Sequence, residues 1–95
     1  MPKQFSDDSV LERSDVVLWT LAPPGILLHN FASRRFLQLD ELGYLAWGFL
    51  DGGRTVQEVI TRCSSNGRTS KMAQREVRAV VKTLFQHGFI EERRA

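Results

Sequence analysis

Residues 35–60 read Arg-Phe-Leu-Gln-Leu-Asp-Glu-Leu-Gly-Tyr-Leu-Ala-Trp-Gly-Phe-Leu-Asp-Gly-Gly-Arg-Thr-Val-Gln-Glu-Val-Ile, and this stretch changes from a strand pattern to a helix pattern at Asp40. Arg35–Leu39 alternates between polar and apolar side chains and predicts a strand. From Asp40 onward the apolar residues recur at helical spacing, and Asp40 can cap the helix by accepting from its free N–H groups. Asp51-Gly52-Gly53 predicts the end of this helix, because glycine adopts the left-handed conformation found there.

Two more helices are predicted after this point. Thr55 and Glu58 have the spacing of a capping box, which places a helix start at Thr55. The clearest helical pattern runs from about Lys71 to His87, and Gly88 ends it. The buried stripe of this helix is expected to consist of Val77, Val80, Val81 and Leu84.

Two further segments with strand character precede the quoted stretch. Val16–Leu21 is β-branched, aromatic and apolar, and Pro23-Pro24-Gly25 predicts a turn after it. Ile26–His29 then resumes the strand pattern. Because the connections are short, the three strands are expected to form an antiparallel meander.

The expected fold is therefore α+β, with a three-stranded antiparallel sheet followed by three helices in a winged-helix-like layout. Residues 1–14 are polar and are expected to form a flexible arm. The expected domain spans residues 15–91, and a charged tail covers residues 92–95.

Composition limits the possible function classes. A chain of 95 residues suits one small domain, and no apolar run approaches the roughly 18 residues that a membrane span needs. The first residues lack the basic start and apolar core of a secretion signal. The single cysteine, Cys63, cannot form an internal disulfide, so we expect a cytoplasmic location.

No catalytic, metal-binding or cofactor-binding pattern is apparent. Nothing near Cys63 supplies a base, and His29 and His87 lack the spacing of metal ligands. Gly52-Gly53 is not followed by the Gly-Lys-Ser/Thr of a phosphate-binding loop. We therefore expect no enzyme activity, no metal and no cofactor.

The order of residues in the quoted stretch resembles the PqqD-like family, also called RiPP recognition elements. Members show an aromatic residue, then Leu-Asn-Glu, a glycine two residues later, and a helix with Trp or a similar apolar residue. Here this order is met by Phe36, Leu39-Asp40-Glu41, Gly43, Trp47 and the segment from Asp51 to Ile60. Asp40 stands where the family usually has Asn, and both residues cap helices. The resemblance covers roughly residues 15–91 and is strongest to the stand-alone proteins of lasso-peptide pathways.

The resemblance implies that the protein binds the leader segment of a ribosomally synthesised precursor peptide and presents it to a tailoring enzyme, such as a leader peptidase, in natural-product or antibiotic biosynthesis. The leader would add as a strand beside Arg35–Leu39, in a groove also walled by the third helix. A helical step of about 100° per residue groups part of the 71–87 helix on one flank, which we expect to face this groove. The expected peptide-binding residues are Arg34, Arg35, Phe36, Leu37, Gln38, Gln74, Arg75, Arg78, Lys82 and Phe85.

Several alternatives stay open. Phe85 can equally broaden the core stripe of its helix, and Trp19 and Trp47 are better explained as core residues than as ligand platforms. The segment from Arg54 to Lys82 holds seven basic and two acidic residues, which suits an acidic partner. DNA binding by a winged-helix protein is therefore the alternative function, although the third helix has few side chains of the kinds that read bases. We favour the peptide and expect no nucleic acid and no membrane as partners.

Overall fold

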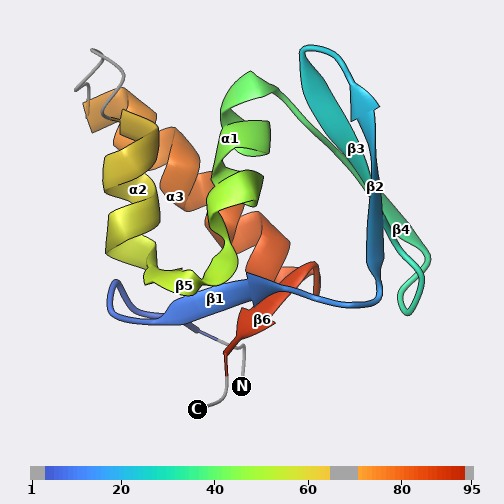
Figure 1. Cartoon of the computed structure of the whole chain (residues 1–95), viewed down its shortest axis with the longest axis horizontal. Coiled ribbons are helices and arrows are strands. Elements are labelled where there is room, and N and C mark those ends of the chain that lie inside the picture. The colour runs from blue at the N-terminus through green and yellow to red at the C-terminus, as the bar shows by residue number, and fades with distance from the viewer. Residues whose placement is uncertain (1–3, 65–70, 94–95) are drawn as a thin grey trace.

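The computed structural model describes residues 4–64 and 71–93, and Figure 1 shows three helices flanked by two small sheets. The helices lie together on one side, one sheet stands beside α1, and the other lies across the ends of the helices. In chain order the elements are β1 (Val10–Arg13), β2 (Val17–Ala22), β3 (Gly25–Asn30), β4 (Arg35–Leu39), α1 (Glu41–Phe49), β5 (Asp51–Thr55), α2 (Val56–Ser64), α3 (Lys71–Gln86) and β6 (Ile90–Glu92).

The first sheet has the order β2-β3-β4 and confirms the predicted antiparallel meander. The middle strand is buried on one face, where Ile26 and Leu28 are fully inaccessible. These side chains share one core with Ala46 and Trp47 of α1. Because the helices cover only one face, the other face of this sheet stays open (Figure 1).

The second sheet has the order β5-β1-β6 and was not predicted. We expected residues 1–14 to be a flexible arm, but Val10–Arg13 is a strand and Leu11 is only 1% exposed. The α+β class is confirmed, whereas the expected order of three strands followed by three helices is not. Gly52 does adopt a positive φ of 82° after α1, but the chain then extends along β1 instead of entering the next helix directly.

The predicted helix caps are present. The Asp40 carboxylate accepts from the backbone N–H of Gly43 at 2.8 Å. Thr55 and Glu58 form the reciprocal capping box. The backbone nitrogen of Thr55 donates to Glu58 Oε1 at 2.9 Å, and the backbone nitrogen of Glu58 donates to Thr55 Oγ1 at 3.2 Å. Glu58 has its pKa lowered chiefly by the hydrogen bond from the Thr55 backbone. Within 4–64 and 71–93, every helix is too short or too polar to cross a membrane.

Candidate functional site

The free edge of β4 is the first part of the candidate site. In the order β2-β3-β4, β4 has a partner on one side only among the described residues. The backbone groups that face this edge follow from the ladder. The carbonyl oxygen of Val16 accepts a hydrogen bond from the backbone N–H of Phe31. In an antiparallel pair only every second residue of a strand bonds to the neighbouring strand, and the residues between them face the other side. The register of β3 with β4 then turns the N–H and C=O groups of Phe36 and Gln38 towards the free edge.

A small hollow adjoins this edge at the C-terminal end of α3. Its volume is about 190 Å³. Leu37 is half-buried there, and Arg35 Nη1 lies 3.4 Å from Nδ1 of His87 on the helix side. The hollow is lined by Arg35, Phe36, Leu37, Thr83, His87 and Phe89. A strand edge and a side-chain pocket thus lie together, which is the combination that a site for an extended peptide needs.

Asn30 holds the two walls of the hollow together. This side chain is only 2% exposed. Its Nδ2 donates to the carbonyl oxygen of Gly88, immediately after α3, at 3.0 Å. Its Oδ1 accepts from the backbone N–H groups of Ala32 and Ser33 in the turn before β4, at 2.9 and 3.0 Å. One amide therefore fixes the β3–β4 turn against the end of the helix.

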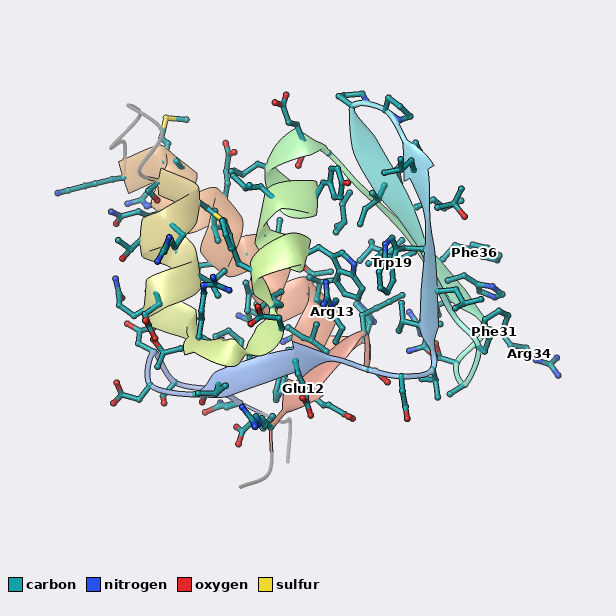
Figure 2. The ribbon with its side chains drawn as sticks, in the orientation of Figure 1. Glu12, Arg13, Trp19, Phe31, Arg34 and Phe36 are labelled. Atoms are coloured by element: carbon teal, nitrogen blue, oxygen red, sulfur yellow. The ribbon has the colours of Figure 1, made fainter. Side chains whose placement is uncertain are left out.

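The outer face of the same sheet is aromatic near β4. Phe36 is 63% exposed, and its ring stacks on His29 with centroids 4.1 Å apart and an interplanar angle of 4°. Figure 2 shows Phe36, Phe31 and Arg34 on the side of the sheet turned away from the helices. Arg34 has a positive φ of 61° in the turn that leads into β4, and its side chain is exposed. A peptide strand beside β4 would therefore meet a different environment on each of its two faces.

The helix flank expected to face the strand edge lies elsewhere. Arg78 forms an ion pair with Asp7, and this bond lowers the pKa of Asp7 and raises the pKa of Arg78. Phe85 is 7% exposed and packs edge-to-face on Phe5, with centroids 5.4 Å apart. These two residues contact the N-terminal segment, and none of the expected helix residues lines the hollow beside β4. The other expected residues of this flank are exposed: Gln74, Arg75 and Lys82.

The helix residues beside β4 are Thr83 and His87, which are not among the residues predicted from the sequence. Helical geometry groups side chains on each side of a buried stripe, but it does not tell which side meets a given strand. Thr83 and His87 are four residues apart and lie on the side of the stripe opposite to Arg78 and Phe85. The i, i+4 spacing of Thr83 and His87 was the only sequence signal that could have pointed to them. Which flank of α3 faces β4 is decided by the path of the whole chain.

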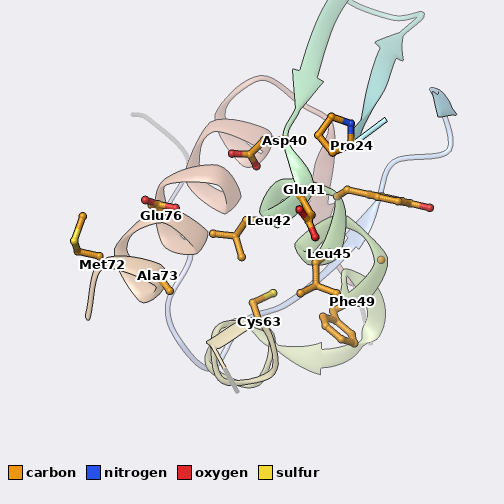
Figure 3. Close-up of a pocket in the computed structure, with 12 residues that line it drawn as sticks. Pro24, Asp40, Glu41, Leu42, Leu45, Phe49, Cys63, Met72, Ala73 and Glu76 are labelled. Carbon is orange, nitrogen blue, oxygen red and sulfur yellow. The ribbon is translucent and has the colours of Figure 1, made fainter. Parts of the chain in front are cut away.

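A second, larger hollow lies between α1, the end of α2 and the start of α3 (Figure 3). Its volume is about 1070 Å³, and Leu42, Leu45 and Phe49 form much of its apolar wall. Cys63 also lines it, and burial raises the pKa of this thiol to about 11. A thiol with such a pKa is protonated at neutral pH, so it is a poor nucleophile. Among residues 4–64 and 71–93, no group of three or more His, Cys, Asp or Glu could hold a metal ion.

Comparisons with known proteins identify a family and a similar fold. The family model described as coenzyme PQQ synthesis protein D (PqqD) matches residues 25–90. A solved structure described as TbiB1 in complex with the TbiA(β) leader peptide is similar in fold, with a TM-score of 0.66. That likeness covers 88% of this chain and 99% of the other at 21% sequence identity. No curated protein sequence matches the chain.

Proposed function

The chain belongs to the PqqD family, and from this premise we propose that it binds the leader segment of a ribosomally synthesised precursor peptide by strand addition to β4. The observation that carries the proposal is the free edge of β4 beside the hollow at the end of α3. The similar fold of TbiB1, whose structure contains a leader peptide, supports it.

The backbone of the leader would supply affinity. Phe36 and Gln38 each offer one N–H and one C=O group to the free edge, which allows up to four hydrogen bonds to an extended peptide. Each such bond contributes about 0.5–1.5 kcal/mol net, because water also bonds to these groups in the free protein. Backbone bonds alone accept any extended chain, so selection must come from side chains.

Side-chain selection would come from the two faces of the bound strand. On the helix-facing side the hollow offers Leu37, Thr83 and Phe89, which suit one bulky apolar side chain of the leader. Arg35 and Arg34 lie at the start of the strand and suit an acidic side chain nearby. On the outer side the stacked ring of Phe36 suits an apolar or aromatic residue. We therefore expect a leader motif that alternates apolar residues and contains an acid.

The cations on the far flank of α3 would act at longer range. Arg75 and Lys82 are exposed, and Arg78 is half-exposed in its pair with Asp7. Such charges steer an acidic peptide towards the protein, and salt screens their effect. In this proposal the protein is an adaptor without catalytic chemistry of its own, and it raises the local concentration of precursor for a tailoring enzyme, such as a leader peptidase of a lasso-peptide pathway.

Fluorescence anisotropy with the labelled leader of the precursor peptide encoded beside this chain's gene tests the proposal. Thr83→Arg would place a long charged side chain in the hollow, and affinity should fall at least about tenfold, which is 1.4 kcal/mol. Gln74→Arg is the matched control, because it adds the same side chain at an exposed position of the same helix, on the flank opposite to Thr83. Equal loss for both variants, or no binding by the unaltered protein, would contradict the proposal.

A further inference from the structure

The exposed apolar surface of this protein is concentrated on one sheet. Residues 16–33 contain no Asp, Glu, Lys or Arg. Among the described residues, seven of the nine large hydrophobic side chains that are exposed fall between positions 16 and 36. They are Val16, Leu18, Trp19, Leu21, Leu27, Phe31 and Phe36. A concentration of this kind on a small protein indicates a surface that another molecule covers.

The strand β2 carries three of these side chains, Leu18, Trp19 and Leu21, and has a free edge of its own. In the order β2-β3-β4 it pairs only with β3 among the described residues. The same alternation that exposes Phe36 and Gln38 on β4 directs the N–H and C=O groups of Trp19 and Leu21 away from β3. The sheet thus offers unpaired backbone groups on both sides.

The two free edges differ in their side chains. Arg34 and Arg35 mark the β4 edge, whereas the β2 edge carries Leu18 at 59% exposure and Leu21 at 64%. Proteins usually protect an edge strand with charged side chains, a bulge or a covering segment, because an uncharged edge pairs with other strands. On β2 neither a charge nor a covering segment is present among residues 4–64 and 71–93.

The edge is also anchored to the rest of the protein through Trp19. The Trp19 ring packs edge-to-face on Trp47, with centroids 5.6 Å apart. The Arg13 guanidinium lies over the same ring at 5.3 Å, and Figure 2 shows Trp19 on the helix-facing side of the sheet. A strand that is already ordered loses little conformational entropy when a second strand joins it.

We propose that the β2 edge binds the β2 edge of a second copy of this chain, in an antiparallel pair around a two-fold axis. An antiparallel pair of identical strands is self-complementary, so each copy offers the same groups to the other. The absence of charge from 16–33 favours this occupant, since the two copies of β2 meet without like-charge repulsion between the paired strands, and Arg13 lies over Trp19 on the helix-facing side of the sheet. The combined sheet has six strands in the order β4-β3-β2-β2-β3-β4, and both β4 edges stay free at its ends.

The pairing is expected to be weak. A stable complex buries roughly 800 Å² on each partner, and one six-residue strand with its neighbours covers less than that. We expect a dissociation constant on the order of 10–100 µM, so the protein is monomeric when dilute and dimeric when concentrated.

Sedimentation velocity of the full chain from roughly 1 to 300 µM tests this pairing. The average mass should rise towards that of two chains. Leu21→Lys places one cation on β2 of each copy, so the two paired strands would repel each other, and association should weaken at least about tenfold. Because Leu21 is 64% exposed, the variant should fold, which circular dichroism checks. Met72→Lys is the matched control, since Met72 is 69% exposed on α3 and lies off this sheet.

Amide hydrogen exchange gives a second measurement. Exchange at Trp19 and Leu21 should slow as the protein concentration rises, whereas exchange at Thr20, whose N–H faces β3, should not change. A single-chain mass at every concentration, or equal association of the Leu21→Lys variant, would overturn the proposal. A leader peptide that dissociates the dimer would support the pairing but contradict the proposed leader site, because the peptide would then occupy β2 and not β4.

Discussion

The clamp formed by Asn30 gives the sharpest test of how the candidate site is held together. Asn30→Ala removes three hydrogen bonds, one to Gly88 and two from the turn before β4. At about 1 kcal/mol for each bond, the loss is roughly 2–3 kcal/mol of unfolding free energy. Water can reach the turn, because Ala32 and Ser33 are exposed, and this limits the loss to that range.

The same change should shift the melting temperature. For a domain of this size 1 kcal/mol corresponds to about 4–8 °C, so Asn30→Ala should lower it by about 10–20 °C. Leader affinity should fall as well, because the end of α3 would no longer be tied to the turn that leads into β4. Guanidinium unfolding followed by tryptophan fluorescence measures the first effect, and anisotropy with labelled leader measures the second.

Asn30→Asp separates the two halves of the clamp. The carboxylate still accepts from the turn, but its second oxygen then faces the Gly88 carbonyl oxygen without a proton to donate. Burial raises the pKa of such a carboxyl, so the charged form destabilises the fold above that pKa. Protonation at lower pH restores a donor to Gly88, and the loss of stability should shrink as the pH falls. An unfolding free energy of Asn30→Ala within about 0.5 kcal/mol of that of the unaltered protein would show that the three bonds contribute little. A loss of stability in Asn30→Asp that does not shrink in acid would contradict the contact with Gly88.

Three further predictions concern the rest of the chain. A Cβ at Gly25 would lie 1.7 Å from a backbone carbonyl oxygen at the end of β4, so Gly25→Ala should lower the free energy of unfolding by more than about 3 kcal/mol. A Cβ at Gly48 would have no atom within 4 Å, so Gly48→Ala should stabilise α1 by about 0.5–1 kcal/mol. Denaturant unfolding compares the two variants, and equal changes in their unfolding free energies would contradict the close contact at Gly25. Arg78→Gln should raise the pKa of Asp7 towards 3.8, which an NMR titration measures. The ion pair stabilises the fold while Asp7 is ionised, and this stabilisation is lost as the pH falls through the lowered pKa. An unchanged pKa in the variant would mean that the pair does not form in solution. With a pKa of about 11, Cys63 should be only about 0.1% thiolate at pH 8 and should react slowly with iodoacetamide, and rapid alkylation of the native protein would contradict its burial.

Local signals in the sequence predicted the parts of the fold that short-range physics controls. Arg35–Leu39 has the bounds of β4, Asp40 caps α1, and Thr55 starts the capping box of α2. Each of these depends on residues within a few positions of one another. A local pattern is therefore enough to identify them.

The unpredicted parts depend on contacts between distant residues. Val10–Arg13 is too short and too polar to predict a strand by itself, and its partners are Asp51–Thr55 and Ile90–Glu92. The same holds for the candidate site. The strand edge was predicted from the sequence, whereas the flank of α3 that meets it depends on how the whole chain packs, and the predicted flank is the opposite one.

The central claim is that a leader peptide adds to the free edge of β4, and residue-resolved amide hydrogen exchange tests it most directly. Upon saturation with the leader, exchange at Phe36 and Gln38 should slow, because their N–H groups face that edge. Leu37 should be unchanged, because its N–H already faces β3, and Trp19 and Leu21 on β2 should be unchanged when measured at a fixed, dilute protein concentration. Protection at Trp19 and Leu21 without protection at Phe36 and Gln38 would contradict the account.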